Sequence, residues 1–371
     1  MANARVCILT SVHSVFDVRI FHKQAKSLVQ AGHSVTLIAP HCKNEIVECI
    51  QIRSLKLKKN RFLRIFITVW LLLRLAIKEK ADVYHFHDPE LIPIGLFLKL
   101  NGKIVIYDVH EDVPRQILSK PWIPKPFRKI TSWIIEKIEN FVAKKFDAVI
   151  TATPFIRDRF LKLSCNAVDI NNFPILKEFP TKKIPWESKS SKAFYLGGIS
   201  EIRGIHQMVE AIGLTGFRLA IAGEFESKSL HESLKKIQGW EQVDELGFLN
   251  RKETADVMAS SNTGIAVFQP APNHINSQPN KIFEYMAAGL PIIASNFPLW
   301  RSIIEDNNCG LCVDPMNSQA IANAIIYLVD HPEESQIMGE NGRRLVEEKY
   351  NWNSESKKLL ELYEKLSSGS H

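Results

Sequence analysis

Two charged residues near position 280 have types and a spacing suited to binding an anionic ligand. Lys281 falls in the first turn of a predicted helix, where the positive end of the helix dipole disfavours a cation. An anion held between the lysine and the free helix amides would remove this cost, as in a diphosphate site. Glu284 lies one turn later on the same face, where a carboxylate can accept hydrogen bonds from a pair of hydroxyls. The alternative is a weak, exposed ion pair.

A glycine-rich turn supplies a second candidate anion contact. A predicted strand over residues 193–196 runs into Gly197 and Gly198, and Arg203 follows at the mouth of a predicted helix. Glycines let the backbone approach a ligand closely, and a guanidinium can hold phosphate oxygens through two N–H groups. We therefore expect these residues to contact the same ligand as Lys281.

The helix that carries Lys281 has clear start and stop signals. Its predicted N-cap is one of three polar residues, Asn276, Ser277 and Gln278. Pro279 is tolerated in the first turn, Gly289 ends the helix, and Pro291 prevents its continuation. Residues 292–294 then read as a short buried strand, which gives a helix, a turn and a strand.

Histidines and carboxylates follow two other predicted strands, over residues 82–86 and 103–107. His85, His87 and Asp88 mark the end of the first strand, and His110 follows the second. Open α/β sheets bind ligands at the carboxyl ends of their strands. A metal site is one interpretation, but His85 and His87 alternate along the chain and are predicted to point to opposite faces. We therefore expect no metal ion and no cofactor.

These motifs resemble those of retaining GT-B glycosyltransferases of the glycosyltransferase family 4 type. The run PNKIFEYMAAGLPIIAS resembles the donor-site helix of that family, and HFHDPE followed by YDVHED resembles its two histidine-containing strand ends. The resemblance implies an α/β protein with the GT-B fold, in which two Rossmann-like domains face each other across a cleft and a C-terminal helix crosses back to the first domain. It also implies retention of configuration without a metal ion or a covalent intermediate.

The resemblance further implies individual roles. His110 takes the position of a histidine that lies against the donor sugar, and residues 246–249 match the segment that holds the nucleobase. Asn276 stands where the family has the first of two glutamates, so it keeps hydrogen bonding without the charge. Gly198 occupies the position of a cation and Arg203 that of a lysine, which makes Lys281 more important.

The candidate site residues therefore fall into three groups. The predicted catalytic residues are His110, Arg203, Lys281 and Glu284. The predicted donor-binding residues are Gly197, Gly198, Phe248, Leu249, Asn276, Asn280 and Glu284. The predicted residues of the acceptor site or of the cleft loop are His13, Asp17, Arg19, His87 and Asp88.

Alternating strand and helix signals predict two α/β domains and a final helix. The predicted domains are residues 1–175, which bind the acceptor, and residues 190–350, which bind the donor, with a crossover helix over 351–367. Residues 169–173 are predicted as the last strand of the first domain, and the proline-containing stretch 174–191 as the linker. Residues 124–145 have helical spacing. The loop after the first strand lacks the Gly-x-Gly-x-x-Gly spacing, which argues against a dinucleotide cofactor.

The basic character of the chain is confined to its first half. Residues 1–180 hold 28 Lys and Arg against 16 Asp and Glu, whereas residues 181–371 hold 19 against 24. An anionic membrane surface is the expected partner, and an inert basic surface is the alternative. Nucleic acid is not expected because no recognition motif is present. The expected membrane contacts in the predicted helix over 55–80 are Lys56, Lys58, Lys59, Arg61 and Arg64. Alternatively, that helix covers the sheet.

Six scattered cysteines and the lack of a signal peptide indicate a reduced, cytoplasmic compartment. The expected activity is that of a retaining, metal-independent hexosyltransferase at the inner face of the cell membrane. It would move a sugar from a UDP- or GDP-sugar to a lipid-linked glycan during lipopolysaccharide or exopolysaccharide synthesis. The alternatives are a nucleotide-sugar 2-epimerase on the same fold and a catalytically degenerate membrane-surface binding protein.

Overall fold

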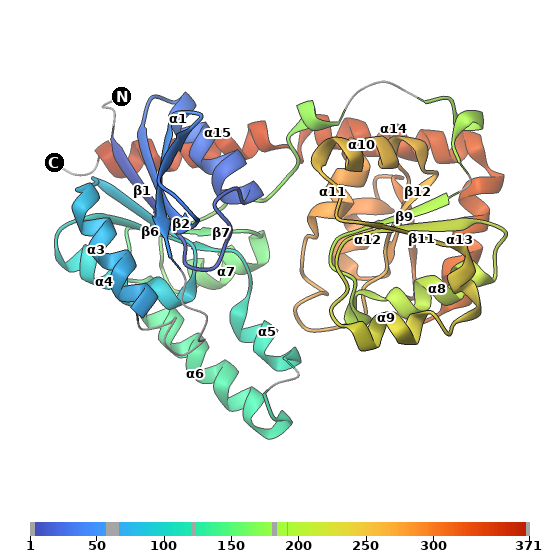
Figure 1. The fold of residues 1–371 in the computed structure, drawn as a ribbon, viewed down its shortest axis with the longest axis horizontal. Helices are drawn as coiled ribbons and strands as arrows, with labels where there is room; N and C mark the ends of the chain where they lie inside the picture. The colour runs from blue at the N-terminus through green and yellow to red at the C-terminus, as the bar shows by residue number, and fades with distance from the viewer. Residues whose placement is uncertain (1–3, 57–66, 121–122, 180–183, 191, 369–371) are drawn as a thin grey trace. The chain divides into compact units, whose positions relative to one another are not determined.

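The computed structural model describes residues 4–56, 67–120, 123–179, 184–190 and 192–368, which form two compact α/β units (Figure 1). The first unit contains the chain up to Asn172 together with the residues from Asn353 onward. The second unit is the continuous segment Phe173–Trp352. The C-terminal helix α15 (Trp352–Ser368) thus returns to the first unit, which confirms the predicted crossover.

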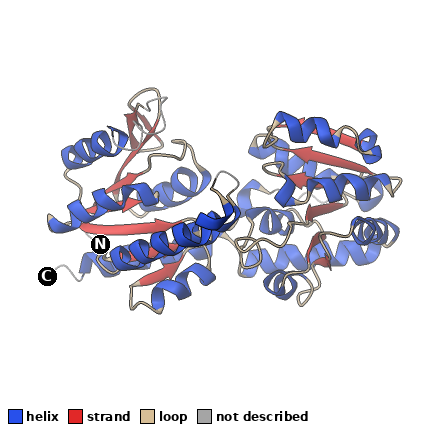
Figure 2. Cartoon of the chain, turned by 90° about the horizontal axis from the view of Figure 1, so that it is seen from below, coloured by secondary structure: helices blue, strands red, loops and turns tan. Residues whose placement is uncertain are grey.

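The first unit is built on a sheet with the strand order β3-β4-β2-β1-β5-β6-β7-β8, in which only the β3–β4 pair is antiparallel. Its inner strands are almost entirely apolar because helices cover both faces (Figure 2). The strands are β1 Arg5–Leu9, β2 Ser34–Pro40, β3 Glu45–Val47, β4 Ile50–Leu55, β5 Val83–Phe86, β6 Ile104–Val109, β7 Ala148–Thr151 and β8 Ala167–Asp169.

The helices of the first unit connect successive parallel strands. Asp17 caps the first of them by accepting hydrogen bonds from the amides of Arg19 and Ile20 at 2.8 and 3.0 Å. These helices are η1 Val18–Ala25, α1 Lys26–Gln30, α3 Val69–Glu79, η3 Pro89–Leu91, α4 Ile92–Leu100, α5 Val113–Ser119, α6 Lys125–Ala143 and α7 Pro154–Leu161.

The second unit is a fully parallel sheet with the strand order β11-β10-β9-β12-β13-β14. Its strands are β9 Lys192–Leu196, β10 Arg218–Ala222, β11 Val243–Gly247, β12 Thr263–Ala266, β13 Ile292–Ser295 and β14 Gly310–Val313. Its helices are α8 Ile205–Gly213, α9 Lys228–Leu234, α10 Arg251–Ser260, α11 Asn280–Ala287, α12 Pro298–Ile304, α13 Ser318–Asp330 and α14 Pro332–Glu348. Short 3-10 turns are η4 Leu176–Glu178, η5 Trp186–Ser188, η6 Glu201–Arg203 and η7 Gln238–Gln242.

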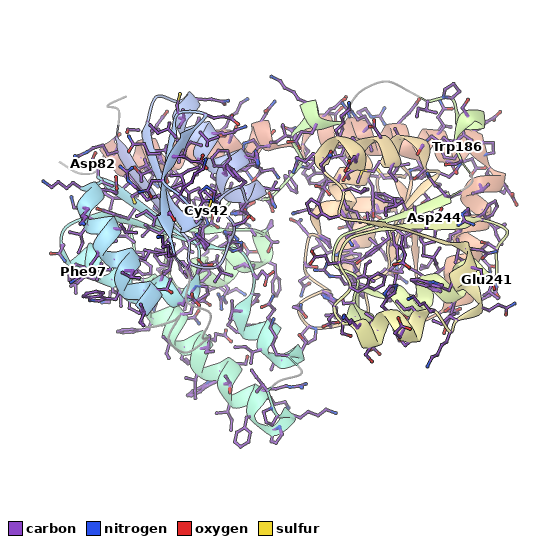
Figure 3. All side chains as sticks on the ribbon, viewed as in Figure 1. Cys42, Asp82, Phe97, Trp186, Glu241 and Asp244 are labelled. Atoms are coloured by element: carbon purple, nitrogen blue, oxygen red, sulfur yellow. The ribbon has the colours of Figure 1, made fainter. Side chains whose placement is uncertain are left out.

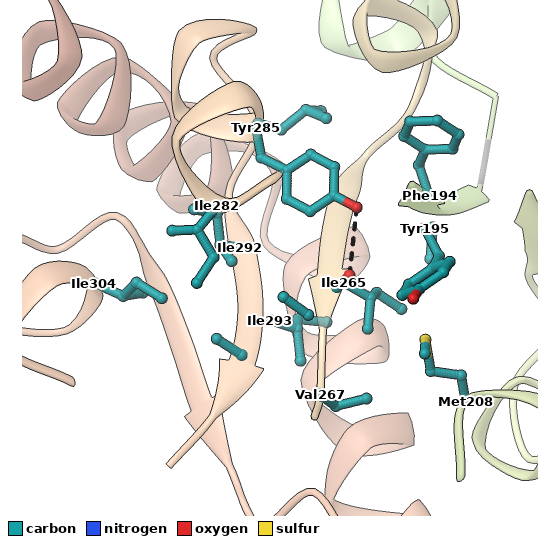
Figure 4. Close-up of a cluster of buried hydrophobic side chains, with 14 of the residues drawn as sticks. Phe194, Tyr195, Met208, Ile265, Val267, Ile282, Tyr285, Ile292, Ile293 and Ile304 are labelled. Carbon is teal, nitrogen blue, oxygen red and sulfur yellow. Dashed lines mark hydrogen bonds between the residues drawn. The ribbon is translucent and has the colours of Figure 1, made fainter. Parts of the chain in front are cut away.

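One tyrosine fixes helix α11 to the sheet of the second unit. The hydroxyl of Tyr285 accepts a hydrogen bond from the amide of Leu196 at 3.0 Å and donates one to the carbonyl of Ile265 at 3.3 Å (Figure 4). Its ring packs on Gly264, where an added Cβ would lie 2.3 Å from the tyrosine Cγ. Only glycine therefore lets α11 lie this close to β12.

The structure confirms the α/β class with two sheet-based units and corrects several local predictions. The last strand of the first unit is β8 Ala167–Asp169, because residues 170–173 leave the sheet instead of forming the strand predicted over 169–173. The helix predicted over 55–80 is wrong at its start, because Leu55 ends strand β4. The part described is α3, which contacts β1, β2 and β4 and so covers the sheet.

Lys56 is exposed, whereas the other predicted membrane contacts, Lys58, Lys59, Arg61 and Arg64, lie outside the described residues. Among the helices that the structure describes, none is both long enough and apolar enough to cross a bilayer.

Candidate functional site

Glycines build the carboxyl edge of the second sheet. Gly197 follows β9, Gly223 follows β10 and Gly247 ends β11. The amide of Gly223 donates to the carbonyl of Gly247 at 2.8 Å, and a Cβ on Gly223 (φ +142°) would lie 2.1 Å from the oxygen of Gly197. Three strand ends therefore meet with main chain against main chain, which leaves room for a ligand to approach the backbone.

The structure brings Arg203 and Lys281 together at this edge, although 77 residues lie between them. A Cβ built on Gly197 would lie 3.4 Å from the Lys281 Nζ and 3.6 Å from the Arg203 Nη1. Both cations also lie over the ring of Phe268, at 4.9 Å for the Lys281 Nζ and 5.7 Å for the Arg203 Cζ. The two predicted anion contacts thus share one location.

Lys281 is the more unusual of the two cations. Its side chain is buried, and its ammonium group has no hydrogen-bond partner within the described parts of the chain. The Nζ lies 3.6 Å from the centre of the Tyr195 ring. Burial and the nearby Arg203 lower the pKa of Lys281 well below its ordinary value, and Glu284 only partly offsets this. A buried ammonium without a hydrogen-bond partner leaves a place for an anion.

Helix α11 begins beside this lysine, and its N-cap differs from the prediction. The N-cap is Pro279, which has no side-chain acceptor, so the predicted cap at Asn276, Ser277 or Gln278 is wrong. The hydroxyl of Ser277 instead donates to the carbonyl of His274 at 2.8 Å, because the chain turns just before the proline. No side chain in the described structure caps the first-turn amides of α11, and the positive end of the helix dipole adds to the two cations.

Gly198 has a role that the sequence did not indicate. Its carbonyl accepts hydrogen bonds from Arg203 Nη1 at 3.2 Å and from the Tyr195 hydroxyl at 2.7 Å. A Cβ at this position would lie 3.0 Å from the same Arg203 nitrogen. The residue that replaces a family cation therefore makes space for the guanidinium and orients it.

The remaining predicted donor residues are distributed around α11 and β11. Glu284 is half-buried one turn after Lys281, Asn280 is exposed at the first position of α11, and Asn276 is half-buried in the turn before it. Phe248 follows β11 with 83 % of its surface exposed, whereas Leu249 packs against the core. An exposed phenylalanine beside the glycine edge offers a flat apolar face to a ligand.

Sequence reasoning missed three residues of this site, namely Tyr195, Phe268 and His274. The ring of His274 lies 5.1 Å from that of Phe268, and its Nδ1 is 3.0 Å from the carbonyl of Gln269. Burial lowers the pKa of His274, and Arg203 and Lys281 lower it further. Tyr195 and Phe268 lie near the carboxyl ends of β9 and β12, and this position was a signal in the sequence. The contacts of His274 depend on tertiary packing and carried no such signal.

The first unit has its own polar cluster, centred on the fully buried Asp108 at the end of β6. Its carboxylate accepts hydrogen bonds from Arg19 at 2.8 and 3.2 Å and from Gln24 at 2.6 Å. Burial opposes ionisation, yet Arg19, His110 and the other histidines hold the pKa of Asp108 well below its ordinary value. Arg19 also donates to the carbonyl of Ile170 at 2.6 Å. The predicted cleft residue Arg19 is therefore half of a buried ion pair.

Three histidines surround this ion pair, and their arrangement corrects one prediction. The rings of His85 and His87 stack with centroids 4.6 Å apart, so the two side chains do not point to opposite faces. Strand alternation ends at Phe86, the last residue of β5, and does not extend to His87. The His87 Nδ1 lies 2.7 Å from the His110 Nε2. His85, His87 and Asp108 offer ligand atoms within 4.8 Å of one another.

The donor set of this cluster fits an ion pair better than a metal ion. The Asp108 carboxylate already accepts three hydrogen bonds from Arg19 and Gln24, and the guanidinium charge would repel a bound cation. That the protein needs no metal ion stays a prediction.

The other predicted cleft residues lie near the same edge of the first sheet. The Nε2 of His13 is 3.5 Å from Asp88, and its ring is 4.8 Å from that of His110. Asp88 accepts hydrogen bonds from the Thr10 hydroxyl at 2.8 Å and the Ser11 amide at 2.7 Å, which hold it in place. Asp17, also predicted as an acceptor-site or cleft residue, caps the N-terminus of η1.

The C-terminal helix contributes to this cluster, which the sequence did not predict. The hydroxyl of Tyr363 lies 2.9 Å from the Nδ1 of the buried His85. Glu355 accepts a hydrogen bond from the amide of Asn171 at 2.6 Å. Helix α15 therefore helps to position the histidines in addition to packing on the unit.

We expect the His110 imidazole to stay neutral from about pH 5 to 8. Burial lowers the pKa of His110 to about 3, because the attraction of Asp108 does not compensate for the desolvation and the repulsion from Arg19. The folded protein then binds the proton less tightly than the unfolded chain, whose histidine pKa is about 6.5. The His110 ring signal, assigned in NMR spectra by its loss in His110→Gln, should not shift over this range. A midpoint near neutral pH would contradict the expectation.

The cysteine pair Cys309-x-x-Cys312 consists of free thiols. Burial raises the pKa of Cys309 to about 11 and that of Cys312 to about 12. Both therefore stay protonated at neutral pH, which disfavours a redox or metal-binding role.

Two family models match the chain, one in each unit. The model described as Glycosyltransferase Family 4 matches residues 18–171, and the model described as Glycosyl transferases group 1 matches residues 177–345.

Known proteins with similar sequences or structures include sugar transferases. D-rhamnosyltransferase WbpZ of Pseudomonas aeruginosa is 24% identical over 272 residues, which cover 71% of this chain and 68% of WbpZ. Phosphatidyl-myo-inositol mannosyltransferase of Mycobacterium leprae is 21% identical over 309 residues, covering 78% of this chain and 75% of the relative. The structure of Anabaena Alr3699/HepE in complex with UDP-glucose superposes with a TM-score of 0.75 at 14% identity, covering 98% of this chain and 100% of that one.

Proposed function

Because the chain belongs to the GT-B glycosyltransferases, we propose that it transfers a sugar from a UDP- or GDP-sugar to a lipid-linked glycan in surface-polysaccharide synthesis. The transfer retains the configuration of the sugar, requires no metal ion and takes place at the cytoplasmic face of the membrane. Two sequence relatives carry the names of a rhamnosyltransferase and a phosphatidyl-inositol mannosyltransferase, and a structural neighbour was solved with UDP-glucose. These names support the donor class and a lipid-linked acceptor.

The observation that carries the proposal is the buried ammonium of Lys281 beside Arg203, without a hydrogen-bond partner in the structure described. Burying an ammonium group that has no hydrogen-bond partner costs stability. Such a group is therefore expected where a bound ligand supplies the missing partner. The ligand is an anion with oxygens in several directions, because a lysine, an arginine and the helix amides converge on it. A nucleotide diphosphate meets this requirement.

In the proposed reaction, the second unit stabilises the leaving group. As the bond between the sugar and the diphosphate lengthens, negative charge grows on the β-phosphate, where Arg203, Lys281 and the α11 amides neutralise it. The acceptor hydroxyl attacks the sugar carbon from the side that the diphosphate leaves, and its proton passes to the departing phosphate. A preorganised set of donors needs little rearrangement during this step.

Other residues are assigned to binding the rest of the donor. Glu284 accepts hydrogen bonds from the ribose hydroxyls, and Phe248 and Leu249 form an apolar wall for the base. The neutral imidazole of His110 exchanges hydrogen bonds with a hydroxyl of the transferred sugar. Membrane contact through the basic residues 56–64 brings the enzyme to a lipid-linked acceptor.

A panel of nucleotide sugars in a thermal-shift assay tests this function. We expect one donor to raise the melting temperature, and Glu284→Ala to remove most of that shift and to lower turnover at least about a hundredfold. Glu241→Ala is the matched control, because Glu241 is an exposed glutamate elsewhere in the same unit (Figure 3). It should behave like the wild type.

Two outcomes would contradict the proposal. If no UDP- or GDP-sugar stabilises the protein, the site is not a donor site. If the donor sugar changes configuration when no acceptor is present, the protein is an epimerase.

A further inference from the structure

Helix α6 presents an apolar stripe to the solvent. Six large hydrophobic side chains recur at helical spacing along its outer side and are between 43 % and 67 % exposed. They are Phe127, Ile130, Trp133, Ile134, Ile138 and Phe141. Soluble proteins rarely leave so many aligned apolar side chains uncovered without a binding role. The sequence predicted the helix correctly, and the structure shows which way its apolar side faces.

Polar contacts hold the opposite side of α6 against the unit. Glu139 accepts hydrogen bonds from the Tyr107 hydroxyl at 2.8 Å and from Arg159 at 2.6 Å, and Glu136 lies 2.8 Å from Arg115. The hydroxyl of Ser132 donates to a backbone carbonyl of α5 at 2.7 Å. Turning the apolar stripe inward would break all of these contacts. The outward orientation is therefore built into the fold, and Figure 1 shows α6 extending with α5 beyond the sheet.

The charged residues of α6 differ in exposure and in pairing. Its two acidic residues, Glu136 and Glu139, are the ones paired on the inner side. The exposed charged residues of α6 and of the two positions after it are all lysines: Lys125, Lys129, Lys137, Lys144 and Lys145. The ammonium of Lys137 lies 5.9 Å from the Trp133 ring, and that of Lys145 lies 5.6 Å from the Phe141 ring. The outer face thus combines aromatic, aliphatic and cationic groups.

We propose that this outer face of α6 docks on an anionic membrane surface. Aromatic and aliphatic side chains with interleaved lysines suit a helix that lies at the boundary between headgroups and acyl chains. A second copy of the chain is a poorer occupant, because a two-fold interface would set the same lysines against each other. The residues of this outer face are not those of the basic stretch 56–64. Membrane docking deepens the proposed function, because it would bring the enzyme to a lipid-linked acceptor. Only this link to the acceptor rests on the proposed function.

Co-sedimentation of the full chain with vesicles tests the docking surface. We expect binding to phosphatidylcholine vesicles that contain phosphatidylglycerol, and weak binding to phosphatidylcholine alone. Ile134→Ser with Phe141→Ser should lower the partition coefficient at least about tenfold, because the apolar contact is lost. Lys137→Glu with Lys145→Glu, which changes the two lysines that lie against Trp133 and Phe141, should remove the preference for anionic lipid. The control pair Ile46→Ser and Leu214→Ser changes side chains that are 70% and 53% exposed elsewhere, and should bind like the wild type.

Three results would overturn the proposal. The first is α6 variants that bind vesicles like the wild type. The second is loss of binding in Lys58→Glu with Lys59→Glu while the α6 variants still bind. The third is a wild-type dimer in sedimentation velocity that the α6 variants convert to a monomer without any lipid binding. The UDP-induced thermal shift of each variant reports on the second unit, so failure here is distinguishable from failure of the proposed function.

Discussion

Lys281→Met should lower turnover at least about a hundredfold and raise the melting temperature of the ligand-free protein. The first effect follows because the β-phosphate loses a cation. The second follows because the substitution removes a buried ammonium that has no hydrogen-bond partner in the described structure. The pKa of Lys281 is lowered in the folded protein, so the unfolded chain binds this proton more tightly. The destabilisation is greatest at low pH and disappears as the pH rises towards about 10.4. Initial rates and melting curves at several pH values test both effects.

Proton uptake gives an independent measure of the same site. A bound diphosphate favours the charged ammonium, so UDP binding should take up a proton where the ligand-free Lys281 is neutral. Calorimetric titrations in two buffers with different ionisation enthalpies report this uptake, which Lys281→Met should abolish. Lys228→Met, at an exposed lysine of the same unit, is the control and should change neither turnover nor uptake. An active, destabilised Lys281→Met protein would show that the ammonium has a structural role.

Asp108→Ala should destabilise the first unit by about 3–5 kcal/mol, because it leaves the guanidinium of Arg19 buried without its counterion. The pKa of Asp108 is lowered in the folded state, so its contribution is present above the unfolded value of about 3.9 and is lost as the pH falls through the folded value. Urea unfolding at neutral pH measures the effect. The enzyme should also lose activity, since His85, His87 and His110 pack around this carboxylate.

The matched control is Asp82→Ala, which removes a carboxylate that pairs with Arg5 at 2.8 Å on the surface (Figure 3). Both partners are about half exposed and screened by water, so the loss should be much smaller than that of Asp108→Ala. The double variant Arg19→Met with Asp108→Leu should recover most of the stability lost in Asp108→Ala, because no isolated charge remains. If Asp82→Ala and Asp108→Ala lowered the free energy of unfolding equally, burial of the Arg19–Asp108 pair would not account for the effect.

Much of the fold could be predicted because parallel strands buried on both faces are short apolar runs. The strands predicted over 193–196 and 292–294 correspond to β9 Lys192–Leu196 and β13 Ile292–Ser295, with bounds that differ by one residue. The edge strand β3 and its neighbour β4 were missed, because strands with exposed side chains carry a weaker signal. The helical period of α6 was equally clear. A helical period shows that one face of a helix is apolar, but it does not show whether the protein core or another surface covers that face.

The candidate site was partly predictable for a related reason. Loops at the carboxyl ends of parallel strands share one edge, so Gly197, Arg203 and Lys281 could be expected to meet. Strand alternation misled the prediction for His85 and His87, because it ends with the strand. Tyr363 and His274 carried no usable signal, since their contacts arise only when distant elements pack.

The order in which the chain is synthesised has a consequence for how the two units are completed. The second unit is one uninterrupted segment, whereas the first requires α15, which is synthesised only after the whole second unit. During translation, the later-encoded unit can therefore finish folding before the earlier one. The bonds from Glu355 to Asn171 and from Tyr363 to His85 close last, so a stalled or shortened nascent chain would expose the histidine cluster while its partner unit is already native.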